Sequence, residues 1–335
     1  MGDLYVLGGV QRPRFRDAQR EWLLFEQAAV ARVSPERGEG EICCRYRTPP
    51  GARASEESSV LFKAGAIAGE RLYACTSTEV MVFALPGFER LGYLSLPFFN
   101  DLHHVAPTPW GTLVVVVTGL DMVAEVTLEG ELVRCWSALG GDPWQRFSRG
   151  VDYRQVATLK PYRAHANFAF WRRGELWVNR GDLGDAICLD HPERRIALGA
   201  GECTHDGFAS HGKIYFTAVD GRLMIVDEDS LRLEQSIVLS DWEPEARRGW
   251  SWCRGVLPVG EGRVWVGFTR IRRTQWQEKV RWVKGLVWGG ARPTRLALYD
   301  LGARRLVREV DMEPLGLHAV FNALPAPAAD GGVGG

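Results

Sequence analysis

Four of the seven histidines in this 335-residue chain stand where a short, strand-like apolar run begins. They occur in "NDLHHVAP", "RAHANFAF", "CTHDGFAS" and "GLHAVFNA", as His103, His165, His205 and His318. Neutral imidazole is a ligand for iron, zinc, copper and nickel, whereas magnesium and calcium prefer oxygen. If the fold brings these distant segments to one point, the four side chains predict a transition-metal site.

His103 has a neighbour, His104, and adjacent residues of a strand point to opposite faces. Taking His103 as the ligand places an apolar residue three positions after each histidine, namely Ala106, Phe168, Phe208 and Phe321. With His104 as the ligand, the spacing from the histidine to the next apolar strand matches the spacing in the His205 blade better. We favour His103 and keep His104 as the alternative.

The elements that must position these histidines repeat along the chain. Units of about 40 residues, each with four short strand-like runs, recur five times, and a β-rich repeat of that period is typical of propeller blades. Glycine-containing turns lead into their apolar runs, as in "GTLVVVV", "GELWVNR", "GKIYFTA" and "GRVWVGF".

A sixth unit is split between the two ends of the chain. Its first strand is expected in "LHAVFNALP" at 317–325, and the other three in "DLYVLGG", "EWLLFEQ" and "EICCRYR". Pairing the two ends would close the ring and remove exposed sheet edges. The prediction is an all-β, six-bladed β-propeller forming a single domain over residues 1–325.

In a propeller the innermost strands surround a central channel, so the four histidines would meet at one mouth of it. Lys63 and Cys253 hold the corresponding positions in the two remaining blades. The plain alternative is that the histidines only line a polar channel.

Other residues near the expected mouth complete the candidate site. Asp206 or Tyr153 is a candidate base, and Arg254 is available for an anionic substrate. Asp101, Asn167 and Asp206 are close enough in sequence to orient the imidazoles. The expected lining of the substrate pocket is Lys63, Trp110, Trp144, Asn167, Trp252 and Cys253.

Two segments, 139–163 and 270–291, do not fit the repeat. Long loops on a rigid scaffold are favoured places for binding surfaces. The second carries Trp276, Val280 and Val283 at helical spacing, and it is equally suited to a contact between copies in a homo-oligomer. The tail 326–335 lacks large apolar residues and is expected to be disordered.

The composition of the chain argues against some classes of binding partner. Lysine plus arginine and aspartate plus glutamate both total 41, so no basic surface for nucleic acid is indicated. Apolar runs such as "LVVVV" are too short for a membrane span, and the N-terminus lacks the features of a secretory signal. Seven cysteines without a CxxC pair indicate no disulfide framework. A cytoplasmic protein acting on a small molecule is expected.

Histidines from four blades around one axis resemble the site of the carotenoid cleavage oxygenases, which are longer and seven-bladed. That resemblance implies Fe(II), dioxygen and an apolar or aromatic substrate. In blade number and size the chain is similar to NHL-type propellers and peptidyl-hydroxyglycine lyase, and this second resemblance implies a zinc site rich in histidine. The fourth histidine departs from the lyase pattern.

Three hypotheses follow. The leading one is a non-haem Fe(II) oxygenase, an oxidoreductase whose metal binds dioxygen. The second is a zinc-dependent lyase or hydrolase, in which the metal polarises a substrate oxygen or activates water. The third is a non-enzymatic propeller scaffold that binds a protein or peptide.

Overall fold

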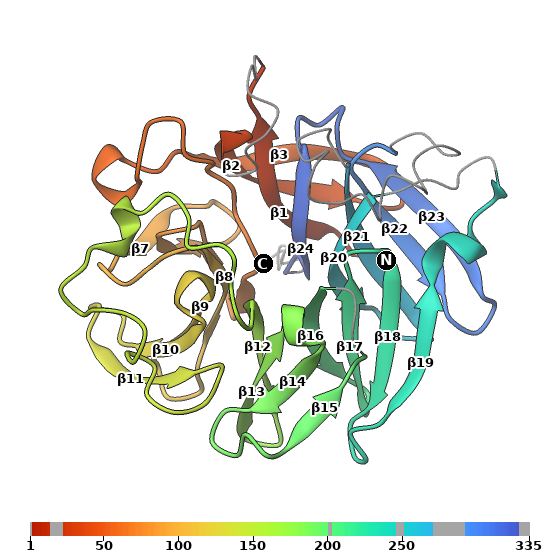
Figure 1. The fold of residues 1–335 in the computed structure, drawn as a ribbon. Coiled ribbons are helices and arrows are strands. Elements are labelled where there is room, and N and C mark those ends of the chain that lie inside the picture. Colours follow the sequence, from red (N-terminus) through yellow and green to blue (C-terminus); the bar gives the residue numbers. More distant parts are fainter. Residues whose placement is uncertain (1, 14–22, 200–202, 246–250, 271–291, 328–335) are drawn as a thin grey trace, which may run out of the picture.

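The structure is a computed structural model that describes residues 2–13, 23–199, 203–245, 251–270 and 292–327. Six four-stranded antiparallel sheets surround a common centre, as Figure 1 shows. The described part of the chain contains only strands and short 3₁₀ turns, with no α-helix. The all-β, six-bladed propeller expected from the repeat is confirmed.

Five blades are built from consecutive strands. In order they are β4 (Ala66–Ala68), β5 (Arg71–Cys75), β6 (Val80–Ala84) and β7 (Arg90–Leu94); β8 (Leu102–Pro107), β9 (Leu113–Val117), β10 (Met122–Val126) and β11 (Leu132–Ser137); β12 (Ala166–Arg172), β13 (Glu175–Arg180), β14 (Asp185–Cys188) and β15 (Arg195–Ala197); β16 (Thr204–Ser210), β17 (Lys213–Ala218), β18 (Arg222–Asp227) and β19 (Leu233–Val238); and β20 (Ser251–Pro258), β21 (Arg263–Arg270), β22 (Arg295–Asp300) and β23 (Arg305–Asp311).

The sixth blade joins the two ends of the chain. Its sheet runs β24 (Ala319–Pro325), β1 (Leu4–Gln11), β2 (Phe25–Ser34) and β3 (Glu39–Tyr46), and Leu4 pairs with Pro325. This closure agrees with the sequence-based prediction in every strand but one. The second strand lies later than "EWLLFEQ", because "AAVARV" provides the run that is buried between neighbouring blades.

The cores lie between blades. In β9, all five residues of "LVVVV" are buried, since one face of the strand packs within its own cluster and the other against the next blade. A continuous apolar run, with no polar alternation, is what a strand covered on both faces requires.

Five of the innermost strands contain a register shift. The residues left out of the pairing are His103 in β8, Asn167 in β12, Asp206 with Gly207 in β16, Gly255 in β20 and Phe321 in β24. A bulge bends its strand and turns side chains to new directions. The histidines therefore lie at different positions relative to these bulges. They are not structurally equivalent residues of the repeat.

The insertion 139–163 is ordered along one rim of the propeller. It carries a single 3₁₀ turn, Tyr153–Gln155, and the Tyr153 N–H donates to the Pro97 carbonyl at 2.7 Å. Asn100 donates from its side chain to the Tyr153 carbonyl at 2.8 Å.

Two further expectations cannot be followed in full. Most of the second insertion, including Trp276, Val280 and Val283, lies outside the described residues, and so does the tail beyond residue 327. No helix in the described part of the chain is long and apolar enough to cross a membrane.

Candidate functional site

Three of the four proposed ligands form a cluster of imidazole rings. The His103 and His165 ring centroids lie 5.2 Å apart, those of His165 and His205 lie 5.4 Å apart, and those of His103 and His205 lie 6.4 Å apart. These rings come from three successive blades, on or just before β8, β12 and β16. Segments that are 62 and 40 residues apart in the sequence thus meet beside the central channel.

His104 is turned away from this cluster. Its ring stacks on Phe168 at a centroid distance of 3.8 Å, and its Nδ1 accepts a hydrogen bond from the Ala169 N–H at 3.3 Å. Burial lowers the pKa of His104 to about 3, so the ring is neutral. Of the adjacent pair, His103 is the one that reaches the other imidazoles.

Cys203 joins the cluster, and sequence reasoning missed it. Its Sγ lies 3.3 Å from Nδ1 of His165 and 3.6 Å from Nε2 of His205. One donor atom from each of these three residues fits within 4.8 Å of the other two. The available signal was the spacing in "CTH", because residues two apart on an extended chain share a face.

His318 takes another role. Its Nδ1 accepts from the Gln11 N–H at 3.3 Å, and its own N–H donates to the Gly9 carbonyl at 2.8 Å. These contacts tie β24 to β1 where the ring closes. The close donor group among the described residues consists of His165, Cys203 and His205 and does not include His318.

His165 is held by the carboxylate of Asp121. Asp121 Oδ1 accepts from the N–H groups of Ala164 and His165 at 3.0 and 3.1 Å, and Oδ2 accepts from Arg146 at 2.8 Å. The backbone of His165 has a left-handed φ of 54°. Such a conformation in a non-glycine residue persists where its surroundings enforce it, and this buried carboxylate provides that restraint.

The charge states of the clustered histidines differ. Burial alone would lower the pKa of His165, but the Cys203 sulfur and the Asp182 carboxylate, 3.2 Å from Nδ1, raise it to about 9. Burial, with the nearby Arg254, lowers the pKa of His205 well below its usual range. The Nε2 atom of His165 is buried and makes no hydrogen bond to any described residue.

A buried charged network adjoins the cluster. The Lys63 ammonium pairs with the Asp101 carboxylate, which also accepts a hydrogen bond from the Tyr162 hydroxyl. His103 Nδ1 lies 2.8 Å from the Asp101 carbonyl and 3.5 Å from Lys63 Nζ. Burial would raise the pKa of Asp101, yet Lys63 holds it well below the usual range. Burial and Lys63 also lower the pKa of His103.

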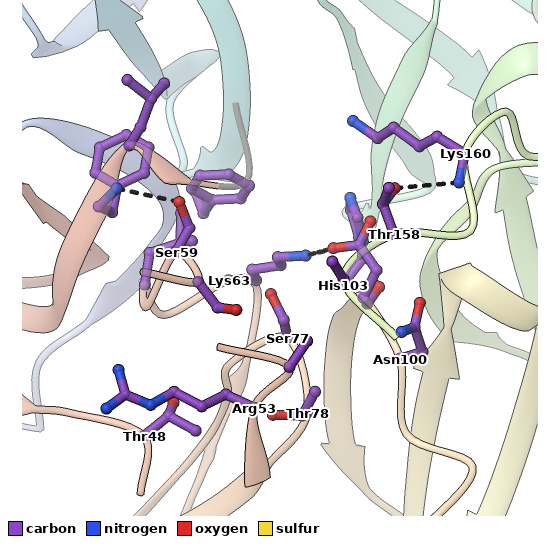
Figure 2. Close-up of a pocket in the computed structure, with 18 of the residues that line it drawn as sticks. Thr48, Arg53, Ser59, Lys63, Ser77, Thr78, Asn100, His103, Thr158 and Lys160 are labelled. Atoms are coloured by element: carbon purple, nitrogen blue, oxygen red, sulfur yellow. Dashed lines mark hydrogen bonds and ion pairs between the residues drawn. The ribbon is translucent and has the colours of Figure 1, made fainter. Parts of the chain in front are cut away.

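A pocket opens beside this network. It encloses about 1300 Å³ including its open mouth, and both His103 and His165 line it. Figure 2 shows Lys63 extending across the pocket toward the side that carries His103, with Lys160 above. The insertion 139–163 forms part of the wall through a run of lining residues, namely Arg154, Val156, Ala157, Thr158, Lys160 and Tyr162.

Some of the expected lining residues are in this pocket and others are not. Lys63, Trp252 and Arg254 line it. Trp110 instead lies 55% exposed at the β8–β9 turn, where it donates to Glu125 and contacts Trp171. A residue close in sequence to a blade entrance can therefore still lie at the far end of its strand.

The other expected site residues pack into the propeller framework. Trp144 packs edge-on against Phe98. The Tyr153 hydroxyl accepts from the Ser148 N–H at 2.9 Å. Cys253 is fully buried between blades. None of the three lines the pocket, because each side chain faces the inter-blade or rim core.

Asn167 and Asp206 brace neighbouring blades. Asn167 donates to the Thr204 carbonyl at 2.6 Å. Asp206 accepts from the Thr217 hydroxyl at 2.6 Å and from the Gly255 N–H at 3.0 Å, and burial raises its pKa to about 6. Both act on the strands that carry the cluster, and neither lines the pocket.

Comparison with known proteins supports the fold only. No protein-family model and no curated protein sequence matches this chain. Among solved structures, a protein of unknown function from Bacteroides caccae superposes with a TM-score of 0.61 at 13% identity, covering 97% of this chain and 99% of its own. A chain of the nidogen/laminin complex gives 0.53 at 11% identity, with 97% and 98% covered. A streptogramin B lyase gives 0.50 at 8% identity, with 92% and 87% covered.

Proposed function

We propose that the chain is a metal-dependent enzyme, a zinc hydrolase or lyase whose ion is held by His165, Cys203 and His205. The observation that carries the proposal is the donor group of these three residues, whose ligand atoms lie within 4.8 Å of one another beside a pocket that His165 lines. Catalytic zinc sites characteristically use three protein ligands and keep one position open.

The donor set fits zinc for two reasons. A thiolate together with imidazole nitrogens is a borderline-soft set, which suits zinc better than magnesium or calcium. The nitrogens next to Cys203 Sγ are Nδ1 of His165 at 3.3 Å and Nε2 of His205 at 3.6 Å, a spacing at which the three donors could share one ion. Bound there, zinc would supply Lewis-acid polarisation of a substrate oxygen.

A neighbouring side chain would accept the proton that the reaction releases. The Asp101 carbonyl lies 2.8 Å from His103 Nδ1 and can only accept a hydrogen bond. Nδ1 therefore carries the proton in the neutral ring, and Nε2 is the nitrogen that can accept one. The Lys63 and Asp101 pair holds the segment in place. His103, which lines the pocket, is therefore the candidate base, in the role that the sequence assigned to Tyr153 or Asp206.

A second candidate is the Fe(II) oxygenase. It is favoured by the three imidazole rings of His103, His165 and His205, which would offer an all-nitrogen set if Cys203 stayed outside the coordination sphere. We place it second because the group of closely spaced donor atoms includes Cys203 and does not include His103. The similar propeller of streptogramin B lyase agrees with lyase chemistry on such a scaffold by analogy alone.

Metal analysis of tag-free protein tests both proposals. We expect close to one zinc per chain, and loss of it in Cys203→Ala and His205→Ala. His211→Ala is the matched control, since His211 lies in a turn between β16 and β17 and should keep the metal. Iron retained in Cys203→Ala after anaerobic reconstitution would support the oxygenase instead. Protein that binds neither metal would refute both and leave the scaffold hypothesis.

A further inference from the structure

The pocket is strongly cationic in a chain with no net charge. Its only lining carboxylate among the described residues is Asp101, whereas six lysine or arginine side chains line it: Arg53, Lys63, Arg154, Lys160, Arg254 and Arg270. Several of these charges are already paired, as Lys63 is with Asp101 and Arg154 with Asp152. The excess still makes the pocket attractive to anions.

Arg254 differs from those paired cations. Its guanidinium lies over the rings of Phe321 and Trp252, at 4.7 and 5.7 Å from their centroids. No carboxylate of the described residues forms an ion pair with it, and its Nε is buried without a hydrogen bond to them. Arg254 also lines the pocket, so its guanidinium can bind an acidic ligand there through charge-assisted hydrogen bonds.

An apolar wall continues from Arg254. Phe321, beneath the guanidinium, packs on a small cluster that includes Leu24, Phe25 and Leu61. All four of these side chains also line the pocket. The pocket thus presents an oriented cation, an aromatic and aliphatic surface next to it, and the imidazoles of His103 and His165 on another part of its lining.

We propose that the pocket binds an organic anion with a flat apolar body, its acid group on Arg254 and its body against the wall of Leu24, Phe25, Leu61 and Phe321. A planar guanidinium stacked on aromatic rings matches the paired oxygens of an acid group better than an ammonium would. The identification of this anion as the substrate rests on the proposed function, but its binding does not, because none of these residues is a metal ligand.

Paired fluorescent probes test the inference. One is 8-anilino-1-naphthalenesulfonate, and the other is N-phenyl-1-naphthylamine, which has the same rings without the acid group. Binding is measured in metal-stripped protein and again after zinc is restored. We expect Arg254→Met to weaken the sulfonate by about 10- to 100-fold, the range for a lost charge-assisted hydrogen bond, and to change binding of the neutral probe less than about 2-fold.

Three variants make the result specific. Arg173→Met removes an exposed arginine paired with Asp229 and should leave both probes unchanged. Arg254→Lys restores the charge and should recover part of the sulfonate affinity. Ala157→Trp narrows the exposed mouth and should weaken both probes, which locates them in this pocket.

Any of three results would overturn the inference: unchanged sulfonate binding in Arg254→Met, unchanged sulfonate binding in Ala157→Trp, or equal losses of both probes in Arg254→Met. Retained binding of the neutral probe shows that Arg254→Met still folds with its pocket formed. Sulfonate binding by metal-stripped protein that takes up no zinc would uphold this inference while refuting the proposed zinc enzyme.

Discussion

Replacing His104 by glutamine should make the protein less sensitive to acid. The ring is 3% exposed, stacked on Phe168, and accepts a hydrogen bond from the Ala169 N–H, an arrangement that requires the neutral form. Burial lowers its pKa from 6.5 to about 3. Between these two values the unfolded chain binds a proton that the folded protein does not, so folding stability falls as the pH drops from 6.5 toward 3.

The size of the effect follows from the same values. Each pH unit below 6.5 costs about 1.4 kcal/mol until the folded-state pKa is reached, so at pH 4.5 the loss from His104 is about 3 kcal/mol. Glutamine can still accept from the Ala169 N–H but does not titrate. His104→Gln should therefore be the less stable protein at pH 7, and the difference should shrink or reverse at pH 4.5.

Urea unfolding at pH 7 and pH 4.5 measures the change. Other buried histidines titrate in both proteins and cancel in the difference. His191→Gln is the control, because its side chain is 57% exposed and its removal should leave the pH dependence of unfolding unchanged. If wild type and His104→Gln lose stability in parallel between the two pH values, the buried neutral ring is not what makes the fold acid-sensitive.

Other predictions concern the framework. Asp121→Ala should weaken metal binding, measured by competition with a chelator, because the backbone N–H groups of the loop that carries one ligand lose the carboxylate that accepts from them. An unchanged zinc affinity would contradict that role. Gly8→Ala should lower the thermal midpoint by several degrees, since a Cβ there would overlap the Ala319 carbonyl in the ring-closing sheet, while Gly2→Ala, where nothing lies within 4 Å, should not. Glu79→Ala should cost about 3 kcal/mol in chemical unfolding, because the buried carboxylate accepts from two tyrosine and two threonine hydroxyls; a loss below about 0.5 kcal/mol would show that these hydroxyls find other partners.

The blades could be derived from the sequence because their determinants are local. Turn glycines, alternating or continuous apolar runs and a period near 40 residues specify four-stranded units without knowledge of their neighbours. The same reasoning paired the two chain ends, as the partnership of β1 and β24 shows. It also brought His103, His165 and His205 toward one axis, since innermost strands of a closed ring must converge.

The make-up of the site depended on tertiary structure. Bulges in the innermost strands, and the left-handed backbone of His165, decide which side chain faces the channel, and neither follows from strand spacing. Cys203 precedes its strand and was left out of the expected site. The Nδ1 of His318 accepts a hydrogen bond from the Gln11 N–H, which could not be foreseen from strand spacing.

The residues around the site also come together only through contacts between distant parts of the chain. Lys63, Asp101 and Tyr162 come from separate parts of the chain and meet only when blades are in place. Trp110 and Trp144 were expected in the pocket on grounds of sequence proximity, yet they lie at a turn and in the rim core. Local patterns encode which strands form, whereas the angles between blades and the packing of the long loop decide which side chains meet.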